Sequence, residues 1–212
     1  MFTFTKNITA YSYSELSEQA KEIVKENLCY DTINELMQFE YNDLWESINK
    51  YAYLIGAIPN SINEYCNNDV HIELDSELED MEGRRFLKYL INHVDFIGLS
   101  YDKRQKLKKY PHLLKCAFSK QAFEETWLTG ICTDVPFLKA VHKFTEWLKN
   151  GDKLTASDFI DLWESTCTEY LNAQERWFTS EEFIEEHFNS NDYYFDSKGN
   201  YINVPAEVLK NL

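Results

Sequence analysis

Apolar residues recur at the three- and four-residue spacing of an α-helix through long stretches of this sequence, which limits its fold more than any other feature. The longest stretch covers 32–55 and has an apolar face made by Ile33, Leu36, Met37, Leu44, Trp45, Ile48, Tyr51, Ala52 and Ile55. Gly56 follows as a natural helix stop, with Pro59 shortly beyond. Because the 212 residues include only 6 glycines and 4 prolines, we predict long helices and not a loop-rich β architecture.

Further helices are predicted wherever the same spacing follows a residue that can cap a helix N-terminus. They cover 15–28, 83–97, 120–128, 134–150, 155–173 and 179–188. The predicted caps are Ser14, Asp134 with Pro136 in the first turn, and two capping boxes formed by Thr155 with Asp158 and by Thr179 with Glu182.

Three short segments have the two-residue alternation or the turn residues of β-strands. One is the aromatic and β-branched segment 2–13. Another is 70–74, where Val70, Ile72 and Leu74 alternate with polar residues. The last is a hairpin of 193–195 with 201–204, in which Gly199 supplies a residue at positive φ.

The predicted fold class is therefore α+β and predominantly helical. It is a helical bundle with a small antiparallel sheet built from the N-terminal strand, the strand near 70–74 and the C-terminal hairpin. A chain of this length suits one domain over 1–212, or two lobes with a hinge near 100–109, where polarity peaks and the apolar period fades.

The net charge of −15 is unevenly distributed along the chain. Residues 1–83 contain 17 acidic and 4 basic residues, a charge of −13, and 121–212 contain 17 and 7, a charge of −10. Between them, 84–120 contain 10 basic and 2 acidic residues, a charge of +8. A field that is negative overall repels nucleic acid at long range, so direct nucleic-acid binding is not expected.

Two charged clusters are candidate interaction surfaces. A protein partner with a basic surface, such as a nuclease or a CRISPR effector, would be attracted by the acidic cluster. The plainer alternatives are a solvated acidic face and basic residues that pair with the acidic flanks. The acidic candidates are Asp75, Glu77, Glu79, Asp80 and Glu82, and the basic candidates are Arg84, Arg85, Lys106, Lys108 and Lys109.

Glycine and cysteine spacing argues against most familiar catalytic and cofactor sites. The closest glycines are 15 positions apart, so no phosphate-binding or dinucleotide-binding loop is present. His71 and Glu73 match half of a zinc deaminase signature, but its paired cysteines are missing. We predict no cofactor, no metal and no enzymatic activity. A Cys–His pair, or a hydrolase or nuclease site assembled only in space, stays an open alternative.

The five cysteines are too widely spaced for a metal or redox motif, and their odd number does not favour a disulfide framework. We predict free, buried thiols. The longest apolar stretch, 51–58, is far shorter than a membrane span, and the N-terminus has no export signal. These features predict a protein of the cytoplasm that does not enter the membrane.

The N-terminal sequence YSYSELSEQAK, from Tyr11 to Lys21, resembles the opening of a group of small phage and prophage accessory proteins. The C-terminal sequence YYFDSKG, from Tyr193 to Gly199, resembles the closing hairpin of the same group. The resemblance implies a phage protein that acts in the bacterial host cytoplasm, in a group that has been loosely labelled antitoxin.

Charge and resemblance together lead to a functional hypothesis. The chain is predicted to inhibit a host nucleic-acid-handling defence protein by protein–protein binding, as anti-CRISPR or anti-restriction proteins do. The alternative is an antitoxin-like or nucleic-acid-contacting accessory protein that uses the basic segment 84–120.

Overall fold

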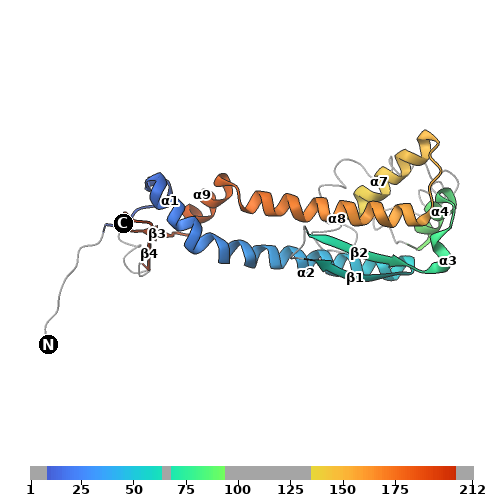
Figure 1. Ribbon diagram of the computed structural model, residues 1–212, viewed down its shortest axis with the longest axis horizontal. Helices are drawn as coiled ribbons and strands as arrows, with labels where there is room; N and C mark the ends of the chain where they lie inside the picture. Colours follow the sequence, from blue (N-terminus) through green and yellow to red (C-terminus); the bar gives the residue numbers. More distant parts are fainter. Residues whose placement is uncertain (1–8, 64–67, 94–134, 204–212) are drawn as a thin grey trace, which may run out of the picture. The chain divides into compact units, whose positions relative to one another are not determined.

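A computed structural model describes residues 9–63, 68–93 and 135–203, and the chain divides into two compact units. One unit consists of 1–37 with 174–212, and the other of 38–173, so the division falls within two long helices, α2 and α8. The helical elements are η1 (Tyr13–Glu15), α1 (Glu18–Val24), the π-helical η2 (Lys25–Cys29), α2 (Tyr30–Ile55), α3 (Ser76–Glu79), α4 (Gly83–His93), α7 (Val135–Asn150), α8 (Ala156–Phe178) and α9 (Glu181–Ser190). The strands are β1 (Ala57–Asn63), β2 (Asp69–Leu74), β3 (Tyr194–Phe195) and β4 (Tyr201–Ile202) (Figure 1).

The predicted class, α+β and mainly helical, is confirmed, but the strands are paired differently from the prediction. β2 shows the expected alternation, with Val70, Ile72 and Leu74 buried between exposed neighbours. It pairs antiparallel with β1, a segment after the helix stop at Gly56 for which no strand was predicted. β3 and β4 form a second pair, so the described strands make two separate sheets.

In the described chain, only one N-terminal residue pairs with the β3–β4 sheet. Tyr11 makes an isolated antiparallel bridge with Phe195, with N–H to carbonyl distances of 2.8 and 2.9 Å. The hairpin turn forms as predicted, because Asp196 Oδ1 accepts the backbone N–H groups of Lys198 and Asn200 and Gly199 adopts φ +85°. Residues 9, 10 and 12 lie in no strand and Tyr13 begins η1, so the predicted strand 2–13 is wrong for these residues. Residues 2–8 lie outside the described residues.

Two of the predicted helix caps are displaced by a few residues. Ser14 caps nothing: Ser12 and Glu15 close the short η1 turn, and Ser17 then caps α1 by accepting the Ala20 N–H. Neighbouring serines compete for the same role, and the extended backbone at 16 and 17 separates the two turns.

At α9 the cap is Ser180, which accepts the Phe183 N–H at 3.2 Å, whereas the predicted Thr179 donates its hydroxyl back to the Glu175 carbonyl. The Thr155–Asp158 box is confirmed, since the Thr155 N–H lies 2.7 Å from the Asp158 carboxylate. The predicted helix 120–128, the hinge near 100–109 and the cap Asp134 lie outside the described residues.

Each unit has its own aromatic core. In the unit of 38–173, Tyr51 of α2 stacks on Phe137 of α7 with ring centroids 3.9 Å apart, and Trp163 of α8 packs edge-on against both. In the other unit, Tyr13 and Phe195 pack on Phe188 of α9. Buried rings of this size supply much of the apolar area that stabilises each unit.

A substitution at Gly199 tests how closely the hairpin packs on α1. A Cβ at this position would lie 2.3 Å from the Ala20 carbonyl oxygen, and its φ of +85° is strained for any L-residue. We expect Gly199→Ala to lower the free energy of unfolding by about 2–4 kcal/mol, from backbone strain and overpacking together. Chemical denaturation followed by circular dichroism measures the change.

Gly151→Ala is the matched control, because Gly151 has φ +95° but no atom lies within 4 Å of the position that a Cβ would take there. It should cost only the backbone strain, about 1 kcal/mol. Equal losses for the two variants would contradict the close approach of Gly199 to α1.

Candidate functional site

The acidic candidates lie on one short exposed segment between β2 and α4, here called the acidic segment (75–82). Asp75 caps α3 by accepting the Glu77 N–H at 3.0 Å. Asp75, Glu77, Glu79, Asp80 and Glu82 are all exposed, while the apolar residues between them, Leu78 and Met81, are partly buried. The acidic segment therefore presents its carboxylates to solvent and its apolar side chains to the protein.

A pair of backbone hydrogen bonds, here called the backbone clamp, holds the end of the acidic segment against the connection between α7 and α8. The Gly83 N–H donates to the Leu154 carbonyl at 2.6 Å, and the Ala156 N–H donates to the Met81 carbonyl at 3.0 Å. A Cβ at position 83 would lie 2.8 Å from that Leu154 oxygen and 3.0 Å from the Leu148 side chain. Only glycine permits so close an approach, so residue 83 fixes where Glu82 emerges.

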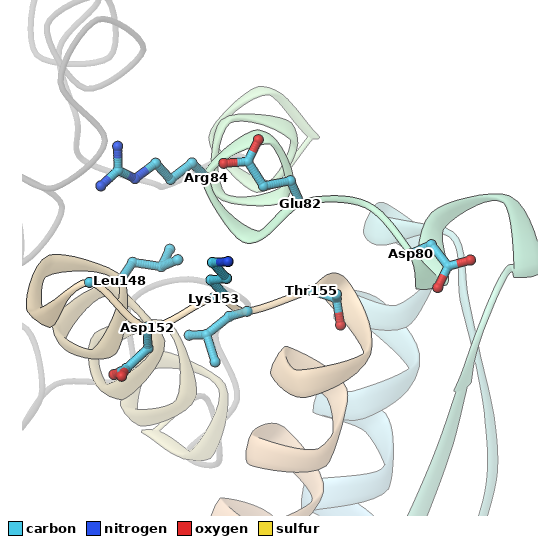
Figure 2. Close-up of a pocket in the computed structure, with 9 residues that line it drawn as sticks. Asp80, Glu82, Arg84, Leu148, Asp152, Lys153 and Thr155 are labelled. Atoms are coloured by element: carbon cyan, nitrogen blue, oxygen red, sulfur yellow. The ribbon is translucent and has the colours of Figure 1, made fainter.

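Beside the backbone clamp lies an open pocket of about 500 Å³. Figure 2 shows Glu82 and Arg84 on the α4 side, Leu148, Asp152 and Lys153 on the side of α7, and Asp80 farther off beside α3. No ion pair or side-chain hydrogen bond joins the charged lining residues to one another or to any other residue of the described chain. The lining is Asp80, Glu82, Arg84, Leu148, Gly151, Asp152, Lys153, Leu154 and Thr155.

The structure thus brings together members of the two charged clusters that are separate in the sequence. Arg84 and Arg85 are exposed in the first turn of α4, directly after the acidic segment, and Arg84 shares the pocket with Asp80 and Glu82. Lys106, Lys108 and Lys109 lie outside the described residues. Within 9–63, 68–93 and 135–203, no grouping of three His, Cys, Asp or Glu side chains could hold a metal ion. The pocket offers ionic contacts of both signs but no paired base and nucleophile.

A polar cluster in the same unit was not predicted from the sequence. Asn68, buried and at φ +57°, accepts from the Tyr41 hydroxyl and donates to Asn172 Oδ1 at 2.8 Å. Its carbonyl accepts from Thr168 at 3.2 Å, so the turn before β2 is tied to both α2 and α8. These bonds satisfy buried polar groups and indicate a structural role.

Glu164 of α8 performs a related task for β2. Its Oε1 accepts the Ile72 N–H at 2.6 Å, and burial raises the pKa of this carboxyl above its usual range. The burial of Glu164 could have been predicted from its spacing in the sequence. It lies four residues after Ile160 and three before Cys167, on the buried face of its helix.

The unit of 1–37 and 174–212 contains a cluster of Lys, Glu, Tyr and Cys side chains, which are residue types that act as catalytic groups in many enzymes. Lys25 forms a 2.5 Å ion pair with Glu181, which also accepts from the Tyr13 hydroxyl at 3.2 Å. The hydrogen bond from Lys25 lowers the pKa of Glu181, and burial raises the pKa of Tyr13. Burial likewise raises the pKa of the nearby Cys29 thiol to about 11.

An activated cysteine needs a lowered pKa and access to solvent, and Cys29 has neither. The cluster is therefore a structural ion pair beside a protonated thiol. Cys167, fully buried in α8, also has a raised pKa through desolvation. Both cysteines are free and buried, as predicted; Cys66, Cys116 and Cys132 lie outside the described residues. His71, the half-match to a deaminase, is exposed on β2.

Comparison of the chain with known protein families, curated proteins and solved structures finds no match. Among the described helices, none combines the length and the apolar character needed to cross a membrane.

Thiol chemistry tests the assignment of Cys29 as inert. With a pKa of about 11, roughly one thiol in a thousand is ionised at pH 8, and alkylation follows the thiolate. We expect the peptides containing Cys29 and Cys167 to stay unmodified when the native protein is treated with iodoacetamide at pH 8, and to react fully in concentrated urea. Mass spectrometry of the digested protein gives the extent at each cysteine, and native labelling of Cys29 as fast as in urea would contradict the assignment.

Proposed function

We propose that the chain is a non-enzymatic acidic interaction protein that binds the basic surface of a nucleic-acid-handling protein and inhibits it. The acidic segment, with Asp75, Glu77, Glu79, Asp80 and Glu82, is the contact surface. In the bacterial setting that the sequence resemblance implies, the target is a host defence protein such as a restriction enzyme or a CRISPR effector.

The observation that carries the proposal is the state of the acidic segment. Its carboxylates are exposed, and no ion pair with another described residue neutralises any of them. The backbone clamp at Gly83 fixes the end from which Glu82 emerges. Charges held on an ordered backbone lose less conformational entropy on binding than charges on a loose loop, which favours a docking role.

The negative charge of the chain also favours one class of partner, proteins with a basic surface. A chain with a net charge of −15 meets basic proteins faster than neutral ones, because complementary fields steer the encounter. Proteins that bind nucleic acid have rows of Lys and Arg arranged for phosphates. Closely spaced carboxylates can occupy such rows and so compete with the nucleic acid.

Charge reversal in the acidic segment tests this function. We expect the purified chain to inhibit plasmid cleavage by a purified restriction endonuclease or CRISPR effector nuclease, less strongly as the salt concentration rises. The double variant Glu77→Lys with Asp80→Lys should weaken inhibition about tenfold or more, since like charges would then face each other. Cleavage rates at several inhibitor concentrations give the inhibition constant.

The control variant is Asp31→Lys with Glu35→Lys, which changes the net charge equally at two exposed carboxylates of α2. It should lose far less inhibition than the variant of the acidic segment. Inhibition that is indifferent to salt and to both reversals would contradict the proposal. If only the double variant Arg84→Glu with Arg85→Glu loses inhibition, the basic segment 84–120 is the contact surface. The antitoxin-like alternative then replaces the proposal that the acidic segment binds the target.

A further inference from the structure

A continuous series of aromatic rings, here called the aromatic row, crosses the unit of 1–37 and 174–212 from the end of α8 to the hairpin. Each neighbouring pair of rings is in contact, with centroids 5.4–6.1 Å apart. Phe183 and His187, one turn apart on α9, stack with an interplanar angle of 25°. In order, the aromatic row consists of Trp177, Phe183, His187, Tyr193 and Tyr201.

The aromatic row is partly exposed to solvent along its length. Its two ends, Trp177 and Tyr201, are 42% and 48% exposed, and the three rings between them are partly exposed. Phe183 and Tyr193 also pack against the core of this unit, which contains Tyr13, Phe188 and Phe195, so the core holds the row in place while part of each ring stays exposed. Large rings left at the surface in a continuous series are typical of a binding site.

Among the described residues, the Asp, Glu, Lys and Arg side chains of α9 and of the turn that follows it are all acidic. α9 contains four glutamates and no lysine or arginine, and Asp192 lies exposed between α9 and β3. Glu182 and Glu186 are exposed, and the helical repeat places them on the stripe next to Phe183 and His187. Arg176 lies beside Trp177, Lys198 lies in the hairpin turn before Tyr201, and Lys25 pairs with Glu181 of α9.

Rings flanked by carboxylates match one side chain better than any other. An arginine guanidinium is planar, stacks on aromatic faces and forms forked hydrogen bonds to carboxylates, whereas a lysine ammonium does not stack. Nucleic-acid bases also stack on rings, but the carboxylates beside these rings repel the phosphates that accompany every base.

We propose that the aromatic row is a second interaction surface, which binds an extended, arginine-bearing segment of a protein partner. Successive guanidinium groups stack on the exposed rings, and Glu182 and Glu186 neutralise their charge. The surface lies in the other unit from the acidic segment, and its assignment does not depend on the inhibitory function proposed above.

The test uses the full-length chain and three fluorescent probes in a physiological salt buffer: a peptide of alternating arginine and serine, the same peptide with lysine, and single-stranded oligothymidine. Fluorescence anisotropy should show tighter binding of the arginine peptide than of the lysine peptide, and no binding of the oligonucleotide. Trp177→Leu and Tyr201→Leu should each weaken the arginine peptide about two- to five-fold, because each removes one stacking face. Both rings are at the surface, so the variants keep the fold, which circular dichroism checks.

Tyr30→Leu is the matched control, since Tyr30 is 71% exposed in the same unit but takes part in no described ring contact with the aromatic row. Tyr30→Leu should leave the binding of the arginine peptide unchanged. Glu77→Lys with Asp80→Lys should leave the preference for the arginine peptide over the lysine peptide unchanged. Equal affinity for arginine and lysine peptides, binding that is insensitive to Trp177→Leu and Tyr201→Leu, or no peptide binding would each overturn the proposal. Oligonucleotide binding that these two substitutions abolish would assign the surface to nucleic acid instead.

Discussion

The hydrogen bond from the Gly83 N–H to the Leu154 carbonyl is the contact on which the arrangement of the candidate site depends. It joins the start of α4 to the connection before α8, two segments far apart in the chain, at a distance that excludes any side chain at residue 83. Because this contact is made by backbone atoms, neighbouring side chains need not be used to hold the segments together. The carboxylates of the acidic segment and the cations Arg84 and Lys153 consequently take part in no ion pair with another described residue.

Local sequence patterns predicted much of the fold, and the failures occurred where distant residues decide. The buried face of β2, the hairpin with Gly199 and the capping box of α8 depend on residues a few positions apart, and all were predicted correctly. β1 was missed because Gly56 and Pro59 indicate a loop, whereas pairing with β2 made this segment a strand. The caps at Ser17 and Ser180 were displaced because adjacent serines and threonines are equally suited to the role.

The candidate site shows the same division between local and long-range information. Composition alone predicted that the carboxylates of 75–82 would be exposed, since closely spaced charges are seldom buried. The pocket that Glu82 shares with Lys153 could not be predicted, because it needs the backbone clamp between segments about seventy residues apart. The aromatic row was also not apparent in the sequence, because its rings belong to α8, α9, β4 and the connection before β3, and no local pattern joins them.

Glu164 has a consequence for how copies of this protein meet. A two-stranded sheet has two open edges, and unpaired N–H groups along an edge recruit strands from other molecules. On β2 the Glu164 carboxylate occupies the Ile72 N–H, and on β1 Pro59 has no N–H to give and is followed by a bulge. At the paired position of Pro59 and Ile72, neither edge therefore offers a free N–H to an added strand. A strand from another copy would meet a missing donor at this point on either side of the sheet, which makes pairing there less stable.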